Sequence, residues 1–362
     1  MERTPLSTNL RLTINNSGST ITDVIWLQTS FIGDIILTTA AMAALDRAAP
    51  HVKQHLITTS AGANALEGHP LLASIHIFKK RQGLLAPIRQ IKNSIKSLNL
   101  KSAVTLQPHR SLRSTILAKY LGFPVVTYRE TSLSFLANVR IPRISVFHET
   151  DRIALLLEGL GIVREDFLNS RPTLHVKAPP VAANFLLNKN LKWIAMAPGS
   201  VWATKRWPSG KFAALASAIV NKPDHGVVLL GGPEDSEICN FIEGSCKNST
   251  PAALTRLVNL AGKTTLQDLL GIYPYLHGLV SNDSSPIHYA SAFNVPTLGI
   301  FGATVPAMGF GPLAEQSQIA EHDLECRPCG DHGHKQCPLK HFKCMNELSV
   351  EATLNKFSEL LA

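Results

Sequence analysis

The stretch VIWLQTSFIGDIILTTAAMAAL, residues 24–45, decides the fold. Its first four residues are apolar and predict a short strand, whereas residues 35–45 carry apolar side chains at helical spacing. The turn between them is mostly polar and ends in Gly33-Asp34. A strand, a loop and a helix in this order are the opening of a βα unit.

Similar units recur along the chain. In the first half we expect helices at 110–121 and 148–160, ended by Gly122 and Gly161, and strands at 54–58, 103–106 and 125–127. After a proline-containing stretch at 171–190 the pattern restarts, with strands at 193–197, 226–230, 278–281 and 297–301 and helices at 210–220, 234–246, 266–273 and 286–293. Alternating strands and helices imply parallel sheets covered on both faces.

The length of 362 residues suggests two domains at the usual size of about 100–200 residues each. We therefore predict an α/β protein with two doubly wound, Rossmann-like domains and a cleft between them. The predicted parts are a polar lead-in at 1–20, an N-terminal domain at 21–178, a linker at 179–190, a C-terminal domain at 191–349 and a C-terminal helix at 350–362.

The composition excludes several classes of protein. Hydrophobic residues make up 45% of the chain and charged residues 17%, which does not fit a disordered protein. No apolar run approaches the roughly 18 residues that span a bilayer, and the polar first twenty residues do not look like a secretory signal. We therefore expect a cytoplasmic protein. The formal net charge of +9 favours an anionic partner, whereas the 6% of aromatic residues argue against a base-stacking platform.

Ligands of open parallel sheets bind beyond the carboxyl ends of the strands, so the loops between strand and helix are the first candidates for a binding site. Residues 278–288, GLVSNDSSPIH, form one such loop. Ser284 and Ser285 can cap the following helix, whose free N–H groups would bind an anion. Asp283 could accept hydrogen bonds from sugar hydroxyls, and His288 would lie one turn into the helix. The alternative is a capped helix with a core histidine.

Residues 197–208, APGSVWATKRWP, form a second loop that suits a diphosphate. Backbone N–H groups near Ser200 and the flexible cation of Lys205 could together bind its charge. The spacing is not that of a Walker loop. An exposed loop with a solvated lysine is the alternative.

Two further loops carry carboxylates. Asp34, after the first strand, is a candidate general base, and its alternative role is to cap the helix. Residues 231–237, GGPEDSE, include Glu237 and could bind a ribose diol, or could place acids in the first turn of a helix.

Four of the six cysteines form the pattern C-x₂-C-x₇-C-x₆-C, with histidines between them. This group could bind a structural zinc ion, stay reduced or form a disulfide. Its members are Cys326, Cys329, Cys337 and Cys344.

Taken together, the sequence resembles the ADP-heptose:lipopolysaccharide heptosyltransferases, and the cysteine group resembles their heptosyltransferase II branch. The resemblance rests on Gly33-Asp34, on residues 198–200 with Lys205-x-Trp207-Pro208, on Asp283-Ser284-x-x-x-His288, and on FGAT at 301–304 and GFGP at 309–312. It implies the GT-B architecture and an inverting transfer of heptose from an ADP-heptose held mainly by the C-terminal domain. No cofactor is then required for catalysis.

The resemblance also implies roles for single residues. Asp34 matches the catalytic base, Lys205 the lysine that binds the diphosphate, and Asp283 the aspartate that holds the heptose. The other donor-binding matches are Ser200 at the diphosphate, Glu237 at the ribose, Thr264 at the adenine, and Ser284, Ser285 and His288 in the phosphate-binding turn. The family usually has glycine where Ser285 stands, which keeps a different nucleotide-sugar donor open.

The acceptor implied by the resemblance is the phosphorylated core of lipopolysaccharide, held by cations of the N-terminal domain. The candidates are Arg110, Arg113, Arg129 and His148, together with Lys79, Lys80, Arg81 and Arg152. The positive net charge fits docking on an acidic inner-membrane surface. A competing hypothesis is a non-catalytic basic protein that binds nucleic acid in a salt-dependent way, but it leaves the loops at Asp34, Lys205 and Asp283 unexplained.

Overall fold

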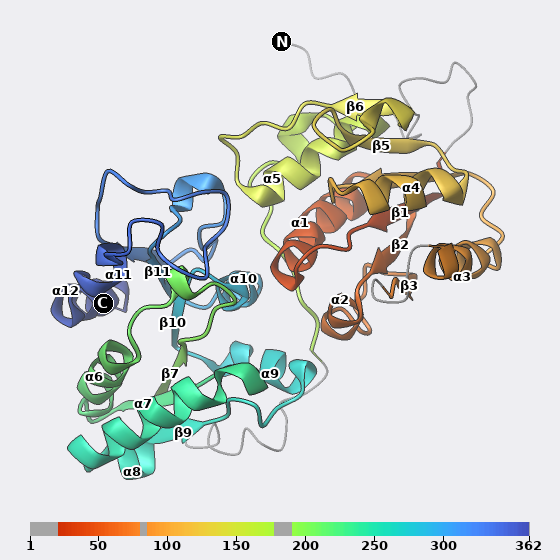
Figure 1. The fold of residues 1–362 in the computed structure, drawn as a ribbon. Coiled ribbons are helices and arrows are strands. Elements are labelled where there is room, and N and C mark those ends of the chain that lie inside the picture. The colour runs from red at the N-terminus through yellow and green to blue at the C-terminus, as the bar shows by residue number, and fades with distance from the viewer. Residues whose placement is uncertain (1–20, 80–84, 177–189, 362) are drawn as a thin grey trace. The chain divides into compact units, whose positions relative to one another are not determined.

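The computed structural model describes residues 21–79, 85–176 and 190–361, and the chain divides into two compact units, Met1–His175 and Val176–Ala362 (Figure 1). The predicted lead-in at 1–20 and nearly all of the predicted linker at 179–190 lie outside the described residues. The predicted cleft between the domains stays a prediction. Among the described residues, no helix combines the length and the apolarity that crossing a bilayer requires.

The first unit contains a parallel sheet of six strands in the order β3-β2-β1-β4-β5-β6. Helices lie between consecutive strands, as a doubly wound fold requires (Figure 1). The strands are β1 Asp23–Leu27, β2 Lys53–Thr58, β3 Ser74–Ile77, β4 Ala103–Gln107, β5 Val125–Tyr128 and β6 Val139–Ile141. The helices are α1 Ile32–Ala48, α2 Ser60–Ala65, α3 Leu85–Lys96, α4 Leu112–Leu121 and α5 Glu149–Ala154, with 3₁₀ turns at Ser134–Leu136, Leu155–Leu160 and Arg164–Asp166.

Local sequence explains where helices of this unit end. The residue after α4 is Gly122, with φ 88°, and the residue after the 3₁₀ turn Leu155–Leu160 is Gly161, with φ 82°. Glycine adopts this left-handed conformation without a Cβ clash, so both predicted helix ends are confirmed. The single helix predicted at 148–160 is wrong, because α5 gives way to the 3₁₀ turn after Ala154.

The second unit repeats the topology of the first, with six parallel strands in the order β12-β11-β10-β7-β8-β9. Its strands are β7 Lys192–Ala197, β8 His225–Leu229, β9 Leu257–Asn259, β10 Gly278–Asn282, β11 Thr297–Phe301 and β12 Ser317–Glu321. Its helices are α6 Ser209–Val220, α7 Ser236–Ser249, α8 Ala253–Arg256, α9 Leu266–Ile272, α10 Ser285–Ala292, α11 Lys343–Asn346 and α12 Val350–Leu360. The 3₁₀ turns are Ala203–Lys205, Pro233–Asp235, Tyr273–Tyr275 and Pro306–Met308.

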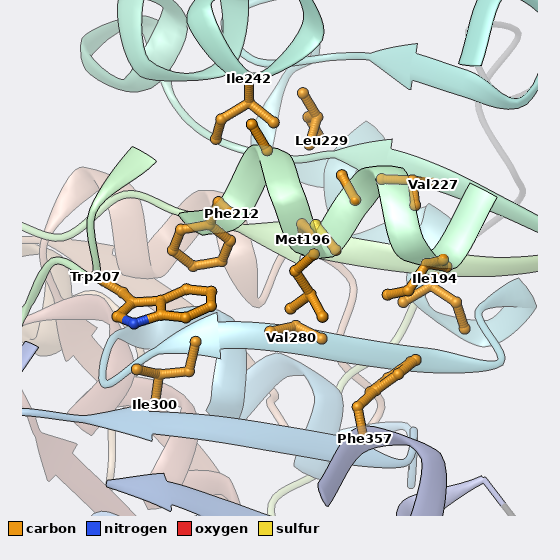
Figure 2. Packing of buried hydrophobic residues seen from close by; sticks show 14 of the residues in the cluster. Ile194, Met196, Trp207, Phe212, Val227, Leu229, Ile242, Val280, Ile300 and Phe357 are labelled. Atoms are coloured by element: carbon orange, nitrogen blue, oxygen red, sulfur yellow. The ribbon is translucent and has the colours of Figure 1, made fainter. Parts of the chain in front are cut away.

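The core of the second unit lies between its sheet and the helices α6, α7 and α12 (Figure 2). Met196 and Val280 contribute from adjacent strands, and the ring of Phe212 in α6 meets that of Trp207 edge-on with centroids 5.2 Å apart. Phe357 joins the cluster from α12, which packs against α6, β11 and β12. The C-terminal helix predicted at 350–362 is therefore part of the second unit.

Each sheet has one point at which the strand order reverses. In the first unit this point lies between β1 and β4, and in the second between β7 and β10. Ligands of doubly wound folds bind in the crevice beyond the carboxyl ends of the strands at this point. The fold therefore directs attention to the loops after these four strands.

A chain of buried polar side chains crosses the first sheet on the side of its strands' amino ends. His55 Nε2 lies 3.0 Å from Asp23 Oδ1, and His55 Nδ1 lies 2.8 Å from Ser74 Oγ. The same hydroxyl lies 2.7 Å from His76 Nε2, whose Nδ1 lies 2.8 Å from Ser94 Oγ of α3. Because each buried polar group has a partner, the chain ties β1, β2, β3 and α3 together.

Candidate functional site

Asp34 lies in the first turn of α1, after β1. The helix begins at Ile32 rather than at the predicted residue 35, so Gly33 and Asp34 belong to the helix and not to the loop before it. The N-cap residue is Phe31, which makes no side-chain cap. The helix N-terminus carries partial positive charge that stabilises a carboxylate at this position.

The surroundings of Asp34 bring its pKa close to neutrality. Burial raises the pKa of this carboxyl most, and the negative charge of Glu149 raises it further. Hydrogen bonds with the Ser30 side chain and the Phe31 backbone lower the pKa, as does the Arg143 guanidinium, and the result is a pKa of about 7. A carboxylate with such a pKa can take up a proton from a substrate hydroxyl near neutral pH.

Glu149, which the sequence did not indicate, is held by two arginines. Its Oε2 accepts from Arg143 Nη2 at 2.6 Å and from Arg152 Nη1 at 3.0 Å. The carbonyl of Arg152 accepts from the Tyr128 hydroxyl at 2.8 Å. Since α5 packs against α1, this buried ion-pair network lies close to the helix that carries Asp34. No motif in the sequence marks this network, and it becomes evident only from the contacts in the structure.

The predicted acceptor cations differ in their exposure and in their contacts. Arg110, Arg113 and Arg129 are exposed and follow β4 or β5, at the same edge of the sheet as the start of α1. Arg152 is 2% exposed and takes part in the Glu149 network, so its assignment as an acceptor cation is wrong.

The other predicted acceptor cations are His148, Lys79, Lys80 and Arg81. His148 caps α5, its Nδ1 accepting from the Thr150 N–H at 3.2 Å, so the ring is engaged in holding the helix. Lys79 is exposed, and Lys80 and Arg81 lie outside the described residues.

In the second unit Lys205 and Asp283 form an ion pair. Lys205 Nζ lies 2.6 Å from Asp283 Oδ2, with the two side chains 14% and 7% exposed. The same oxygen accepts from the Thr304 hydroxyl at 2.5 Å. The predicted lysine and aspartate thus come together on the two sides of the β7–β10 reversal, and Thr304 is a partner that no motif singled out as a site residue.

The loop that carries Lys205 is fixed at both ends by Asn282, the last residue of β10. The Asn282 amide donates to the Pro198 carbonyl at 2.7 Å, and its oxygen accepts from the Trp207 N–H at 3.0 Å. Inside the loop, Arg206 Nε donates to the Ser200 carbonyl at 2.7 Å. The loop is therefore anchored and Lys205 and Ser200 are both half-buried, which does not fit the alternative of an exposed loop with a solvated lysine.

The loops after β7, β8 and β9 lie against one another. A Cβ added to Gly199 would lie 2.1 Å from Asp235 Oδ1, and the other oxygen of Asp235 accepts from the Gly232 N–H at 3.1 Å. The Gly262 N–H donates to the Gly231 carbonyl at 3.1 Å. These contacts bring the three loops to one edge of the sheet, and the Lys205–Asp283 and Asn282–Pro198 contacts place the loop after β10 beside the loop after β7.

Two further predicted donor residues lie in or directly after these loops. Glu237 is exposed in the first turn of α7, and Thr264 is half-buried between β9 and α9. Their predicted roles at ribose and adenine stay predictions.

The turn between β10 and α10 differs in detail from the prediction. Ser284 is the N-cap, but its side chain does not cap α10, because its hydroxyl donates to the Asn282 carbonyl at 3.2 Å. The Ser285 hydroxyl forms a hydrogen bond with Tyr289, whose pKa burial raises to about 12. His288 is 5% exposed, with its ring 6.4 Å from that of Phe310, as the core-histidine alternative expects.

The cysteines at 326, 329, 337 and 344 gather in one neighbourhood. The thiols of the six cysteines are free, and among the described residues no set of three or more His, Cys, Asp or Glu side chains is arranged to hold a metal ion. Cys329 Sγ donates to the Cys326 carbonyl at 3.1 Å. Burial raises the pKa of the Cys329 thiol, and the thiols of Cys326 and Cys337 raise it further.

Comparison of the sequence with known proteins identifies the family to which it is similar. The model of glycosyltransferase family 9 (heptosyltransferase) matches residues 94–343. The chain is 31% identical over 178 residues to lipooligosaccharide heptosyltransferase 2 of Campylobacter jejuni, covering 49% of this chain and 53% of that one. It is 24% identical over 323 residues to lipopolysaccharide heptosyltransferase 1 of Pseudomonas aeruginosa, covering 84% and 85%. The matches to several of these curated relatives thus span about half of the relative's length.

Solved structures show the same fold. A glycosyl transferase family 9 protein of Veillonella parvula superposes with a TM-score of 0.80 at 21% identity, covering 94% of this chain and 97% of that one. The ADP-heptose lps heptosyltransferase II of E. coli superposes with a TM-score of 0.74 at 21% identity, covering 94% and 98%. The predicted GT-B fold of two Rossmann-like units is confirmed.

Proposed function

Because the chain belongs to glycosyltransferase family 9, the heptosyltransferases, we propose that it transfers a heptose from ADP-heptose to the phosphorylated inner core of lipopolysaccharide, with inversion at the anomeric carbon. The observation that carries the proposal is the Lys205–Asp283 pair, held by Thr304 at the strand-order reversal of the second unit. The names of the relatives support the substrate class.

The donor would bind at this reversal. A nucleoside diphosphate brings negative charge, which the Lys205 ammonium beside the Asp283 carboxylate can bind. Moving the ammonium onto the phosphates leaves Asp283 free to accept hydrogen bonds from the sugar hydroxyls, while Thr304 keeps its carboxylate in place. As ADP leaves, the same ammonium would stabilise the growing negative charge.

The proton would be taken by Asp34. An acceptor hydroxyl attacks the anomeric carbon, the bond from that carbon to the diphosphate oxygen breaks, and the hydroxyl proton passes to the Asp34 carboxylate. A pKa of about 7 suits a base at neutral pH, and such a base contributes roughly 10²–10⁴-fold in rate. We further propose that the step needs no divalent cation, because Lys205 supplies positive charge at the leaving group; turnover unchanged by a chelator is the expected result.

The acceptor would bind through the exposed arginines beside α1. Arg110, Arg113 and Arg129 lie at the carboxyl edge of the first sheet, where their guanidinium groups can bind phosphates of the glycolipid core. With a formal net charge of +9, we also propose that the protein acts in the cytoplasm and docks on an acidic membrane surface. Flotation with vesicles of acidic lipid, compared with neutral vesicles, tests this contact.

The donor itself is tested with a panel of ADP-heptose, other ADP-sugars and UDP-sugars. Transfer from ADP-heptose to a deacylated phosphorylated core, followed by mass spectrometry, is the expected result. Preference for another sugar nucleotide would favour the alternative that Ser285 keeps open, in which the same fold uses a different donor. The Ser285→Gly variant is the matched comparison, because it restores the residue usual in the family and removes the hydrogen bond to Tyr289.

A structural zinc ion in the cysteine group stays a prediction. Elemental analysis of the purified protein tests it directly. A stoichiometric metal content that falls when Cys326 and Cys344 are replaced would support zinc, and a protein without metal would support the alternatives of reduced thiols or a disulfide.

A further inference from the structure

The segment that contains the first two members of the cysteine group has no part in the proposed transfer, yet it contacts both sides of the donor site. Arg327, whose side chain is 3% exposed, donates from its guanidinium to the carbonyls of Gly302 and Thr304, the latter at 3.0 Å. It is paired with Glu321 Oε2 at 2.7 Å. A buried guanidinium that bonds several carbonyls of one loop fixes the path of that loop.

The next residues strengthen the same contact. The Cys329 N–H donates to the Ala303 carbonyl at 2.8 Å. The loop that is held in this way carries Thr304, whose hydroxyl donates to Asp283 Oδ2 at 2.5 Å. Arg327 and Cys329 are therefore connected to the Asp283 carboxylate through the loop that carries Thr304.

The other end of the segment contacts the turn that carries Lys205. Thr204, which is 3% exposed, accepts from the His334 N–H at 2.7 Å, and its own N–H and hydroxyl both donate to the His334 carbonyl at 3.1 Å. A Cβ added to Gly333 would lie 2.4 Å from Trp202 Cβ and 3.0 Å from Lys205 Cγ. Only glycine allows the backbone to approach the stem of Lys205 this closely.

One hydrogen bond closes the segment on itself. His334 Nε2 lies 2.7 Å from the Cys329 carbonyl, so the end that contacts the Thr304 loop is tied to the end that contacts the Lys205 turn. Residues 327–334, here called the bridging segment, thus connect the two sides of the Lys205–Asp283 pair from outside the sheet.

We propose that the bridging segment sets the separation of Lys205 from Asp283, and that Thr204 and Arg327 are positioning residues of the donor site. The identity of the ligand as an ADP-sugar rests on the proposed function. A lysine side chain is flexible, and ordering it costs conformational entropy at the moment of binding. A turn fixed through Thr204 places the ammonium in advance, which lowers that cost.

The test replaces the Thr204 hydroxyl while keeping the shape of the side chain. Thr204→Val removes the two hydrogen bonds of the hydroxyl to residue 334, and Thr204→Ser keeps them. By calorimetry with ADP on the full chain, we expect the Val variant to bind on the order of tenfold more weakly, because the turn that carries Lys205 is then no longer fixed through the hydroxyl. The Ser variant should stay within about threefold of the wild type. In the Val variant, the KM for the donor should rise while the KM for the acceptor stays unchanged.

A second variant covers the case in which Thr204→Val fails to fold. Gly333→Ala introduces a methyl group against Lys205 and Trp202, and it should weaken ADP binding with a circular dichroism spectrum like that of the wild type.

Wild-type affinity for ADP in both Thr204→Val and Gly333→Ala would overturn the proposal. Equal losses of affinity in Thr204→Val and Thr204→Ser would also overturn it. Heptose transfer by the wild type is measured in parallel. Its absence would overturn the proposed function alone, because the role of the bridging segment is read from ADP affinity.

Discussion

The Lys205 ammonium lies 2.6 Å from the Asp283 carboxylate, and the two residues follow β7 and β10, the strands at which the sheet order reverses. The pair is nearly buried, so each charge depends on the other. A ligand that draws the ammonium away must therefore offer at least as much negative charge as Asp283 does. A diphosphate meets that requirement and a neutral sugar does not, so the proposed function predicts that the site selects nucleotide-linked donors.

Replacing Lys205 by methionine should weaken ADP binding by roughly 10- to 100-fold, because a hydrogen bond to a charged group is worth about 1.5–3 kcal/mol. Isothermal titration calorimetry measures the change. Lys247→Met on α7 is the matched control, since its ammonium is paired with Glu243 at 2.7 Å on a partly exposed helix face. Equal affinity in the Lys205 and Lys247 variants would show that the diphosphate binds elsewhere.

Turnover should rise with pH through about 7, as the Asp34 carboxyl loses its proton. The Asp34→Asn variant should lose roughly 10²–10⁴-fold in kcat and the pH dependence with it. A pH–rate profile of both proteins, with donor and acceptor saturating, gives the measurement. An Asn variant that keeps the same rising limb would place the base at another residue.

The same substitution has a predicted effect on stability that serves as an internal check. The folded-state pKa of Asp34 is raised, so the folded protein holds this proton up to about pH 7 and loses stability as pH rises from about 4 to 7. The asparagine side chain does not ionise, and the Asp34→Asn variant should therefore melt at or above the wild-type temperature at pH 8. A lower melting temperature would mean that the loss of activity reflects damage to the fold.

The buried histidine chain at the amino ends of the first sheet should make this unit sensitive to acid. Burial lowers the pKa of His76 in the folded state, and His55 lowers it further. The unfolded chain then binds the proton more readily, so the stability that is present above pH 6.5 declines as pH falls below it. Scanning calorimetry between about pH 5 and 8 should show this decline, and His76→Gln should flatten it. An unchanged slope would exclude His76 as its source.

The contact between Gly199 and Asp235 should tolerate no side chain. Gly199→Ala places a methyl group 2.1 Å from the Asp235 carboxylate, and we expect a loss of about 1–3 kcal/mol in the free energy of unfolding together with weaker ADP binding. The control is Gly210→Ala in α6, where an added Cβ meets nothing within 4 Å. That change should leave ADP binding intact and stabilise the helix by up to about 1 kcal/mol. Equal melting temperatures for the two variants would contradict the tight approach.

The central strands were predictable from the sequence because both faces of each are buried. Residues 23–27 of β1 and 278–282 of β10 are buried throughout, and their central residues are apolar, as in Val24 to Leu27 and Leu279-Val280. The edge strands β3, β6, β9 and β12 were not predicted. They are three to five residues long, and β12 exposes Glu321 while most of its other residues are only half-buried, so neither a run nor an alternation marks them.

For the candidate site, the sequence indicated the residues that chemistry requires but not those that position them. Lys205 and Asp283 stand at strand ends in recognisable loops and come together as expected. Thr304 and Arg327 act through contacts with residues more than twenty positions away, and only folding brings these partners together. Glu149 pairs with arginines three and six residues away, but no motif marked it as part of a site. His148 has a structural role that the sequence analysis did not assign, since its ring caps α5, and its contact with the acceptor stays a prediction.

The two sheets share one strand order, which makes β1 and β7 equivalent positions. The first turn of the helix after β1 carries the acidic side chain of Asp34, and the connection after β7 carries the basic side chain of Lys205. Under the proposed function, the acceptor preference and the nucleotide preference would therefore reside in different halves of the chain. A chimera that joins residues 176–362 of this chain to the first half of a relative should keep the nucleotide preference of this protein and adopt the acceptor of the other.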